Sequence, residues 1–333
     1  MSSTKTSKIA GLIGTLFLIG VAVTAGWVLL NRQYVLDQLT IWSYTPSQEI
    51  AAINETVQFT EKGKFAFYAT KPEISAPEDF NQQCPRQEVG SPILGCYTTD
   101  DRIYIFDLEN KQLDGMEEVT AAHEMLHAVW VRTSDEDKQR LTTEIKRVYD
   151  GLKNDELKER MEYYERTEPG EFANELHSIL ATEIKDVGPE LESYYGQYFD
   201  RSSVLALHEQ YSKVYKKLYA RADVVYKAME ALSASIEAKS DSYNTKSAAL
   251  SRDIEAFNAR ANSGSFSSVS QFNAERDQLV ARRNQLESER ASINNNIARY
   301  DALYKEYQDI GEQIELLNDS VDSYKKIESS PLV

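Results

Sequence analysis

The hydrophobic pattern of the chain begins with one long apolar segment. Residues 9–30 carry no charged side chain, and as a helix these 22 residues reach about 33 Å, enough to cross the roughly 30 Å hydrocarbon core of a bilayer. Lys5 and Lys8 precede the segment, whereas Arg32 closely follows it and is soon balanced by Asp37. By the positive-inside rule, we expect a single-pass membrane protein with a cytoplasmic N-terminus and an extracytoplasmic remainder.

A cleaved signal peptide is the alternative interpretation of this segment, with "VTA" ending at Ala25 as the cleavage site. The apolar run, however, continues through Trp27 to Leu30 and exceeds the usual signal core of about 7–15 residues. We therefore prefer a membrane anchor, and whether the segment is ever cleaved stays open.

The C-terminal part has a different pattern, in which apolar or aromatic residues recur every seven positions. One such series is Phe272, Leu279, Leu286, Ile293, Tyr300, Tyr307, Ile314 and Val321, and a similar series runs from Tyr215 to Phe257. Sustained heptads predict a coiled coil. The Ser- and Gly-containing break at residues 262–271 favours an antiparallel hairpin of two arms within one chain over a long parallel homodimer.

Between these two parts, the pattern predicts a stalk, two regions of strand and a series of helices. Residues 45–47 resemble a helix start, and residues 64–70 and 93–108 have the composition of strands, the latter with "TTDD" as a hairpin turn. From residue 114 onward the pattern is helical, with breaks at residues 169–170 and 188–189. We expect a predominantly helical α+β fold.

Charge narrows the range of partners. The chain has 37 Lys and Arg residues against 53 Asp and Glu residues, a formal net charge of -16. Because phosphate binding needs a basic face, we expect no nucleic-acid partner.

Cys84 and Cys96 are the two cysteines of the chain. Outside the cytoplasm, two nearby cysteines usually form a disulfide. A pair of thiolate metal ligands is the weaker alternative, because structural zinc sites usually space such cysteines about two to four residues apart.

The candidate chemistry lies in "HEMLH", residues 123–127. On a helix, His123 and His127 share one face, so both imidazoles can bind one zinc ion. Glu124 is offset along the helix, where it can act as general base toward a zinc-activated water. The alternative is a coincidental match on an ordinary helix.

A catalytic zinc ion needs a third protein ligand, and the best candidate is Glu175 in the segment "NELHS" formed by residues 174–178. Together with His123-Glu124-x-x-His127, this segment resembles the gluzincin class of zinc metallopeptidases, whose second helix carries a glutamate ligand within N-E-x-x-S. The resemblance covers about residues 65–200. It implies a zincin fold with one catalytic Zn²⁺ and a small sheet whose edge strand, here residues 102–107, binds the peptide substrate.

The resemblance is incomplete, because Ile179 stands where the class usually has an acidic residue. The carboxylate that orients a ligating histidine must therefore come from elsewhere. His177 is the competing third ligand, since it lies two residues from Glu175 and only one of the two can face the ion. Asn174 and Ser178 are the other candidates for an alternative ligand or for a group behind the ligands.

A group that stabilises the oxyanion is also expected, because negative charge develops on the carbonyl oxygen during attack. Tyr194, Tyr195, Tyr198 and Arg201 are the candidates. The alternative for each is a packing role or an ion pair.

The sequence thus predicts a membrane-anchored zinc metallopeptidase, with endopeptidase activity on a peptide or protein substrate. One alternative is a coiled-coil membrane scaffold with an inactive or structural zincin-like domain, and another is a zinc hydrolase acting on non-peptide envelope components. Substrate, oligomeric state and the role of the coiled coil stay open, although the coiled coil could bind a protein partner or self-associate. The expected segments are a cytoplasmic tail (1–8), a transmembrane helix (9–30), a stalk (31–60), a zincin-like domain (61–204), a coiled-coil hairpin (205–325) and a tail (326–333).

Overall fold

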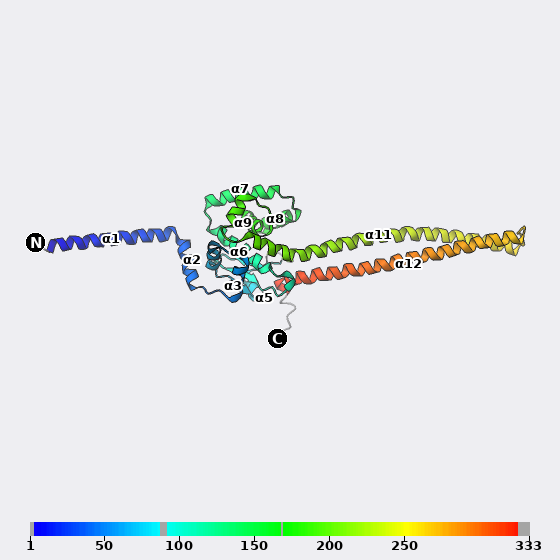
Figure 1. The fold of residues 1–333 in the computed structure, drawn as a ribbon, viewed down its shortest axis with the longest axis horizontal. Helices are drawn as coiled ribbons and strands as arrows, with labels where there is room; N and C mark the ends of the chain where they lie inside the picture. Colours follow the sequence, from blue (N-terminus) through cyan, green and yellow to red (C-terminus); the bar gives the residue numbers. More distant parts are fainter. Residues whose placement is uncertain (1–2, 87–91, 168, 326–333) are drawn as a thin grey trace, which may run out of the picture. The chain divides into compact units, whose positions relative to one another are not determined.

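The computed structural model describes residues 3–86, 92–167 and 169–325, with side chains from residue 15 onward. The expected tail at residues 326–333 and the first two residues of the expected cytoplasmic tail lie outside this part. The chain is predominantly helical, with one small sheet and two long helices, as the sequence predicts (Figure 1). It divides into two compact units, one formed by Met1–Val214 with Leu317–Val333 and the other by Tyr215–Leu316.

The N-terminal segment forms two helices, α1 (Ser3–Leu30) and α2 (Arg32–Ser43). Within the part of the chain whose side chains are described, no single helix has the length and apolar character needed to cross a bilayer. Thr15–Leu30 and Arg32–Ser43 meet that criterion together by length and composition, but they are bent by 86°.

Two short helices follow, and one of them corrects a prediction. Helix α3 (Gln48–Val57) begins at the predicted start, where Ser47 accepts a hydrogen bond from the Ile50 amide. Residues 64–70, predicted as a strand, instead belong to helix α4 (Glu61–Ala69). The Thr60 side chain caps this helix by accepting from the Gly63 amide. This cap and the buried helical face outweigh the β propensity of the aromatic residues.

The sheet has three strands, β1 (Glu73–Ser75), β2 (Gly95–Tyr97) and β3 (Ile103–Phe106), in the order β1-β3-β2. Strands β2 and β3 pair antiparallel, which confirms the hairpin predicted within residues 93–108. The prediction that residues 102–107 form the edge strand is wrong, because β3 lies in the centre. Strand β1, which the sequence pattern did not reveal, pairs parallel with the other side of β3 and leaves β2 as an edge.

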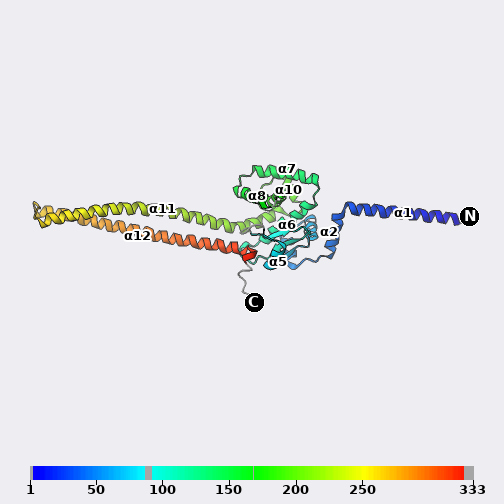
Figure 2. The same ribbon diagram turned by 180° about the vertical axis from the view of Figure 1, so that it is seen from behind.

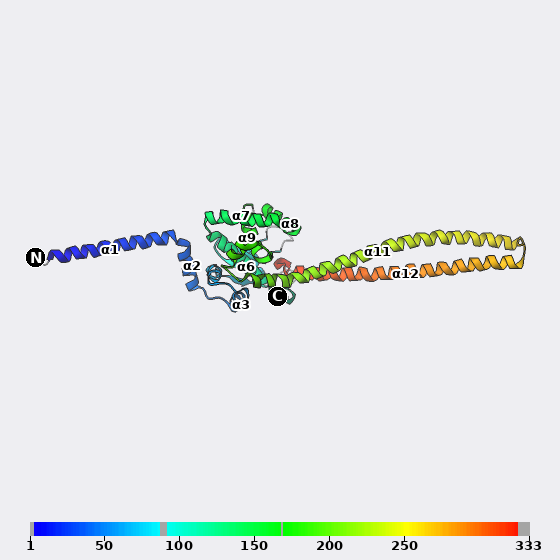
Figure 3. The ribbon, with the colours of Figure 1, turned by 45° about the horizontal axis from the view of Figure 1, so that its top comes forward.

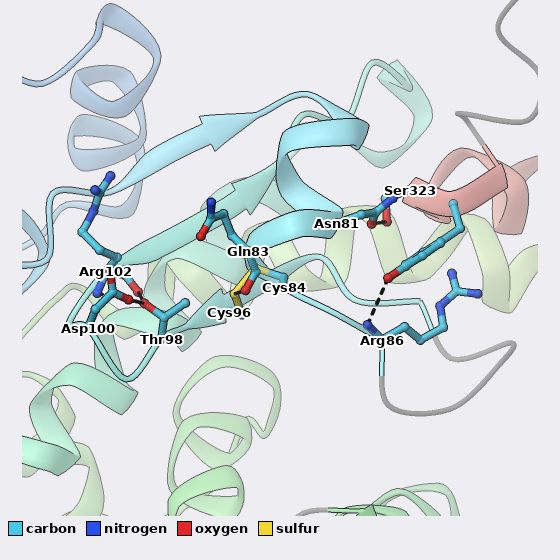
Figure 4. The surroundings of a disulfide bond; sticks show 10 residues. Asn81, Gln83, Cys84, Arg86, Cys96, Thr98, Asp100, Arg102 and Ser323 are labelled. Carbon is cyan, nitrogen blue, oxygen red and sulfur yellow. Dashed lines mark hydrogen bonds between the residues drawn. A yellow bond between two sulfur atoms is a disulfide. The ribbon is translucent and has the colours of Figure 1, made fainter.

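The predicted disulfide between Cys84 and Cys96 is present and joins the end of α5 (Pro77–Gln83) to β2 (Figure 4). The segment after residue 317 packs beside it. Ser323 donates to Asn81, the Arg86 amide donates to the Tyr324 hydroxyl, and the Arg86 side chain pairs with Asp322. The returning end of the chain is thereby fixed to the first unit.

Five helices complete the core of the first unit: α6 (Met116–Arg132), α7 (Asp135–Gly151), α8 (Asp155–Thr167), α9 (Phe172–Glu183) and α10 (Gly188–Tyr195). A 3-10 turn, η1 (Lys111–Leu113), precedes α6. The two breaks at residues 169–170 and 188–189 lie between helices, as predicted. Buried side chains of α6 and α9, including Met125, Leu126 and Leu180, form one hydrophobic cluster.

The second unit consists of most of helices α11 (Arg201–Asn262) and α12 (Val269–Ser320). The two helices run side by side in all three views (Figures 1, 2 and 3), which confirms the hairpin within one chain. Val225, Met229 and Ile310 form a buried cluster between them, and Lys246 pairs with Glu289 across the seam at 2.7 Å.

Candidate metal centre

Helix α6 places the HExxH residues against the core. Apolar side chains such as Ala122, Met125 and Leu126 bury one side of the helix. His123 and His127, four residues apart, therefore lie on one face, with their ring centroids 4.9 Å apart. Glu117 and Glu118 in the first turn complement the positive end of the helix dipole.

Helix α9 brings Glu175, the third candidate ligand, close to the two histidines. Nε2 of His123 lies 3.7 Å from Oε2 of Glu175, and Nε2 of His127 lies 3.4 Å from its Oε1. One ligand atom from each of the three residues lies within 4.8 Å of the others.

The two distances from the histidine nitrogens to Glu175, 3.4 and 3.7 Å, are close to those of a tetrahedral zinc site. With bonds of about 2.0–2.2 Å, ligand atoms in a tetrahedron lie about 3.3–3.6 Å apart. Two imidazole nitrogens and one carboxylate oxygen also form a typical ligand set for catalytic zinc, which leaves the fourth position for water or substrate. Glu175 and His127 are each 7% exposed, so the cluster lies at the edge of the core rather than in open solvent.

Electrostatics favours the ionised form of the Glu175 carboxyl. Burial raises its pKa, but the charges of His127, His123 and Arg160 lower it by more, so the net pKa is lower than usual. An ionised carboxylate is the form that binds a metal ion.

A chain of side chains orients His127. Its Nδ1 lies 3.0 Å from Oδ1 of Asn174, and Nδ2 of Asn174 donates to Glu171 at 2.9 Å. With its proton on Nδ1, the ring presents the Nε2 lone pair to the cluster. The class usually has an acidic residue at the position of Ile179 to orient a histidine. In this chain Glu171 is the corresponding candidate, and it acts on His127 through Asn174.

Glu124 is buried between α6 and the edge strand β2. Burial raises the pKa of its carboxyl above the usual value, while His127, His123 and the Tyr97 amide oppose the shift. A raised pKa suits a group that must take up a proton and later release it. Gly95 makes this packing possible, because a Cβ atom there would lie 2.5 Å from Thr120 Cγ2 and 2.9 Å from Glu124 Cγ.

His177 lies away from the cluster, in an aromatic environment. Its ring centroid is 5.1 Å from that of Trp130, and its Nε2 lies 3.2 Å from the Tyr194 hydroxyl. Burial and, secondarily, His127 and His123 lower its pKa to about 3, so the ring is neutral. Ser178 is also internal, since its hydroxyl donates to the Asn174 carbonyl within α9.

The four oxyanion candidates are engaged elsewhere. Tyr195 donates to the His177 carbonyl, and the ring of Tyr194 packs on those of His177 and Tyr198. Arg201, 2% exposed, donates to backbone carbonyls at the end of α9 and pairs with Glu192. Tyr194 and Tyr195 thus contact the middle of α9 and Arg201 its end, and none of the four belongs to the cluster of His123, His127 and Glu175.

Tyr164 on α8 is a candidate that the sequence analysis missed. Burial raises the pKa of its hydroxyl, and the charges of Glu175 and Glu124 raise it further, so the phenol stays protonated. The sequence offered no signal for this residue, because α8 and α9 approach each other only in the folded chain.

No protein-family model, no curated protein and no solved structure matches this chain.

Proposed function

We propose that the chain is a membrane-anchored zinc metallopeptidase of gluzincin-like type, with its catalytic domain on the extracytoplasmic side. The proposal rests chiefly on the convergence of His123, His127 and Glu175 next to the buried Glu124. The position of β2 at the edge of the sheet, beside Glu124, supports a peptide substrate, since an extended peptide can add to a sheet edge. The apolar residues 9–30 and the disulfide support the proposed location.

His123, His127 and Glu175 would hold the ion, with His127 oriented by Asn174. Zinc, when bound, supplies a Lewis acid that polarises the scissile carbonyl and lowers the pKa of the attacking water. Glu124 takes the proton of that water and passes it to the leaving amine, in keeping with its raised pKa. Tyr164 donates its hydroxyl proton in a hydrogen bond to the carbonyl oxygen as negative charge develops there.

The test compares the full chain in lipid vesicles with Glu124→Gln, using Glu118→Gln on the same helix as the matched control. Zinc content and cleavage of a mixed peptide library are measured for all three. About one zinc per chain in each protein, with cleavage lost only in Glu124→Gln, is the expected result. Zinc without cleavage in any of them would favour a scaffold with a structural zinc site, and absence of zinc would refute the metal centre.

A further inference from the structure

Helix α2 exposes an apolar face to solvent. Leu36, Leu39 and Trp42 are 45%, 52% and 79% exposed, and Val35 lies in the same sector. At 100° per residue these four side chains span about 120° of the helix surface. Arg32 and Ser43, the first and last residues of the helix, fall in the same sector. Such a face is costly in water and indicates an apolar surrounding.

The opposite face of α2 is fixed to the globular part of the first unit. Asp37, 3% exposed, pairs with Arg132 at 2.8 Å, and Arg132 also pairs with Asp101 at 2.7 Å. The ring of Tyr34 stacks on Phe65 with 5.6 Å between centroids. This face of α2 therefore lies outside any hydrocarbon environment, because placing the charged groups of Asp37 and Arg132 in lipid would be costly.

One further exposed apolar side chain is adjacent in sequence to the residue that holds α2. Among the described residues from 44 to 214, Val131, 54% exposed, is the only large hydrophobic side chain in the exposed class. It directly precedes Arg132, which holds α2. By contrast, α1 exposes many such side chains, including Leu29 at 75% and Leu30 at 88%.

We propose that α2 lies in the membrane–water interface, with Val35, Leu36, Leu39 and Trp42 in contact with lipid, and holds the peptidase domain on the bilayer surface. The inference rests on the proposed membrane anchor and peptidase function. Three features favour lipid over a protein partner: α2 follows directly on the apolar α1, it is bent by 86° from that helix, and the only charged residue in its exposed sector is the basic Arg32. Amphipathic helices with tryptophan and leucine on the apolar face are typical of this interface.

This placement indicates a substrate class. Arg132 follows His127 by five residues and His123 by nine, so the metal ligands lie about 8–14 Å along α6 from the residue that holds α2. A site fixed so close to the attachment of α2 is suited to polypeptide segments of membrane-anchored proteins next to the bilayer. A peptide tethered to lipid is therefore the preferred substrate over the same peptide free in solution.

The first test measures fluorescence quenching by brominated lipids in vesicles that contain the full chain. Because the chain has three tryptophans, paired Trp→Phe substitutions leave Trp42, Trp27 or Trp130 as the one emitter. Trp42 and Trp27 are expected to lose more than about half of their emission, and Trp130, inside the domain against His177, to lose little. Quenching of Trp27 without quenching of Trp42 would overturn the inference while leaving the anchor intact, and quenching of neither would refute the anchor as well.

The second test uses Leu36→Glu with Leu39→Glu, and Val269→Glu as the matched control at an exposed position of α12. Cleavage of a lipid-tethered peptide is expected to fall about tenfold in the double variant, with cleavage of the free peptide unchanged. Equal rates on the tethered peptide in the parent and the double variant would overturn the inference. Absence of cleavage of either peptide by the parent would instead refute the proposed peptidase.

Discussion

Replacing Asn174 with alanine tests how the metal centre is organised. The substitution removes the acceptor 3.0 Å from His127 Nδ1 and also the donor to Glu171. His127 is 7% exposed, so water replaces this partner poorly. Losing a hydrogen bond at such a site costs about 1–3 kcal/mol, which corresponds to about a 5- to 150-fold loss of zinc affinity. Groups behind the ligands in other zinc proteins contribute by similar factors.

The assay is competition for zinc between the full chain and a fluorescent chelator at pH 7.5. Glu171→Gln is the graded comparison, because glutamine can still accept from the Asn174 amide and should cost less. Asn81→Ala, at the contact with Ser323, controls for removing a partly buried, hydrogen-bonded asparagine elsewhere in the first unit. A zinc affinity of Asn174→Ala within about twofold of the parent would refute the orienting role of this residue.

Three further substitutions test other parts of the account. Gly95→Ala should lower kcat at least about tenfold with zinc retained, because the new Cβ displaces Glu124. Gly311→Ala is the matched control, since a Cβ there would have no atom within 4 Å. Equal kcat values for Gly95→Ala and the parent would contradict the argument. Tyr164→Phe should lower kcat/KM by about 100-fold or more with zinc retained, whereas Tyr163→Phe should leave kcat/KM unchanged. A loss of zinc from Tyr164→Phe would instead indicate that Tyr164 has a role in the fold. Glu117→Gln tests the carboxyl of Glu117. Burial raises the pKa of this carboxyl to about 7, although the hydrogen bond from the Leu108 amide lowers it. The folded state holds this proton more tightly than the unfolded state, so the stability of the parent falls as pH rises from about 4.5 to 7. Because Glu117 is partly exposed, solvent weakens this effect. In urea unfolding, the free energy of unfolding of Glu117→Gln should therefore exceed that of the parent by about 1–2 kcal/mol at pH 8 and equal it at pH 5. A difference that does not vary with pH would contradict the assignment.

The sequence pattern predicted what depends on spacing along one element. His123 and His127 share a face because both lie on α6, and the heptads of α11 and α12 account for the hairpin. It did not predict features that depend on contacts between distant segments. Residues 64–70 have the composition of a strand, but the Thr60 cap and the close approach of Gly63 to the Tyr198 carbonyl select a helix.

The candidate site shows the same division. Glu175 and Asn174 both came from the segment formed by residues 174–178, but only the packing of α9 on α6 shows that Asn174 contacts His127. Tyr164 and Gly95 belong to no motif, since their proximity to Glu124 results from the placement of α8 and β2. Arg201 donates to backbone carbonyls at and beyond the end of α9, and a buried arginine in this role has the same sequence signature as one that binds substrate.

The most direct test of the metal centre is an anomalous difference map at the zinc absorption edge from crystals of the zinc-loaded protein. The account predicts one peak about 2.0–2.2 Å from Nε2 of His123, Nε2 of His127 and one carboxylate oxygen of Glu175. A peak bound through His177, or zinc bound without contact to Glu175, would contradict it.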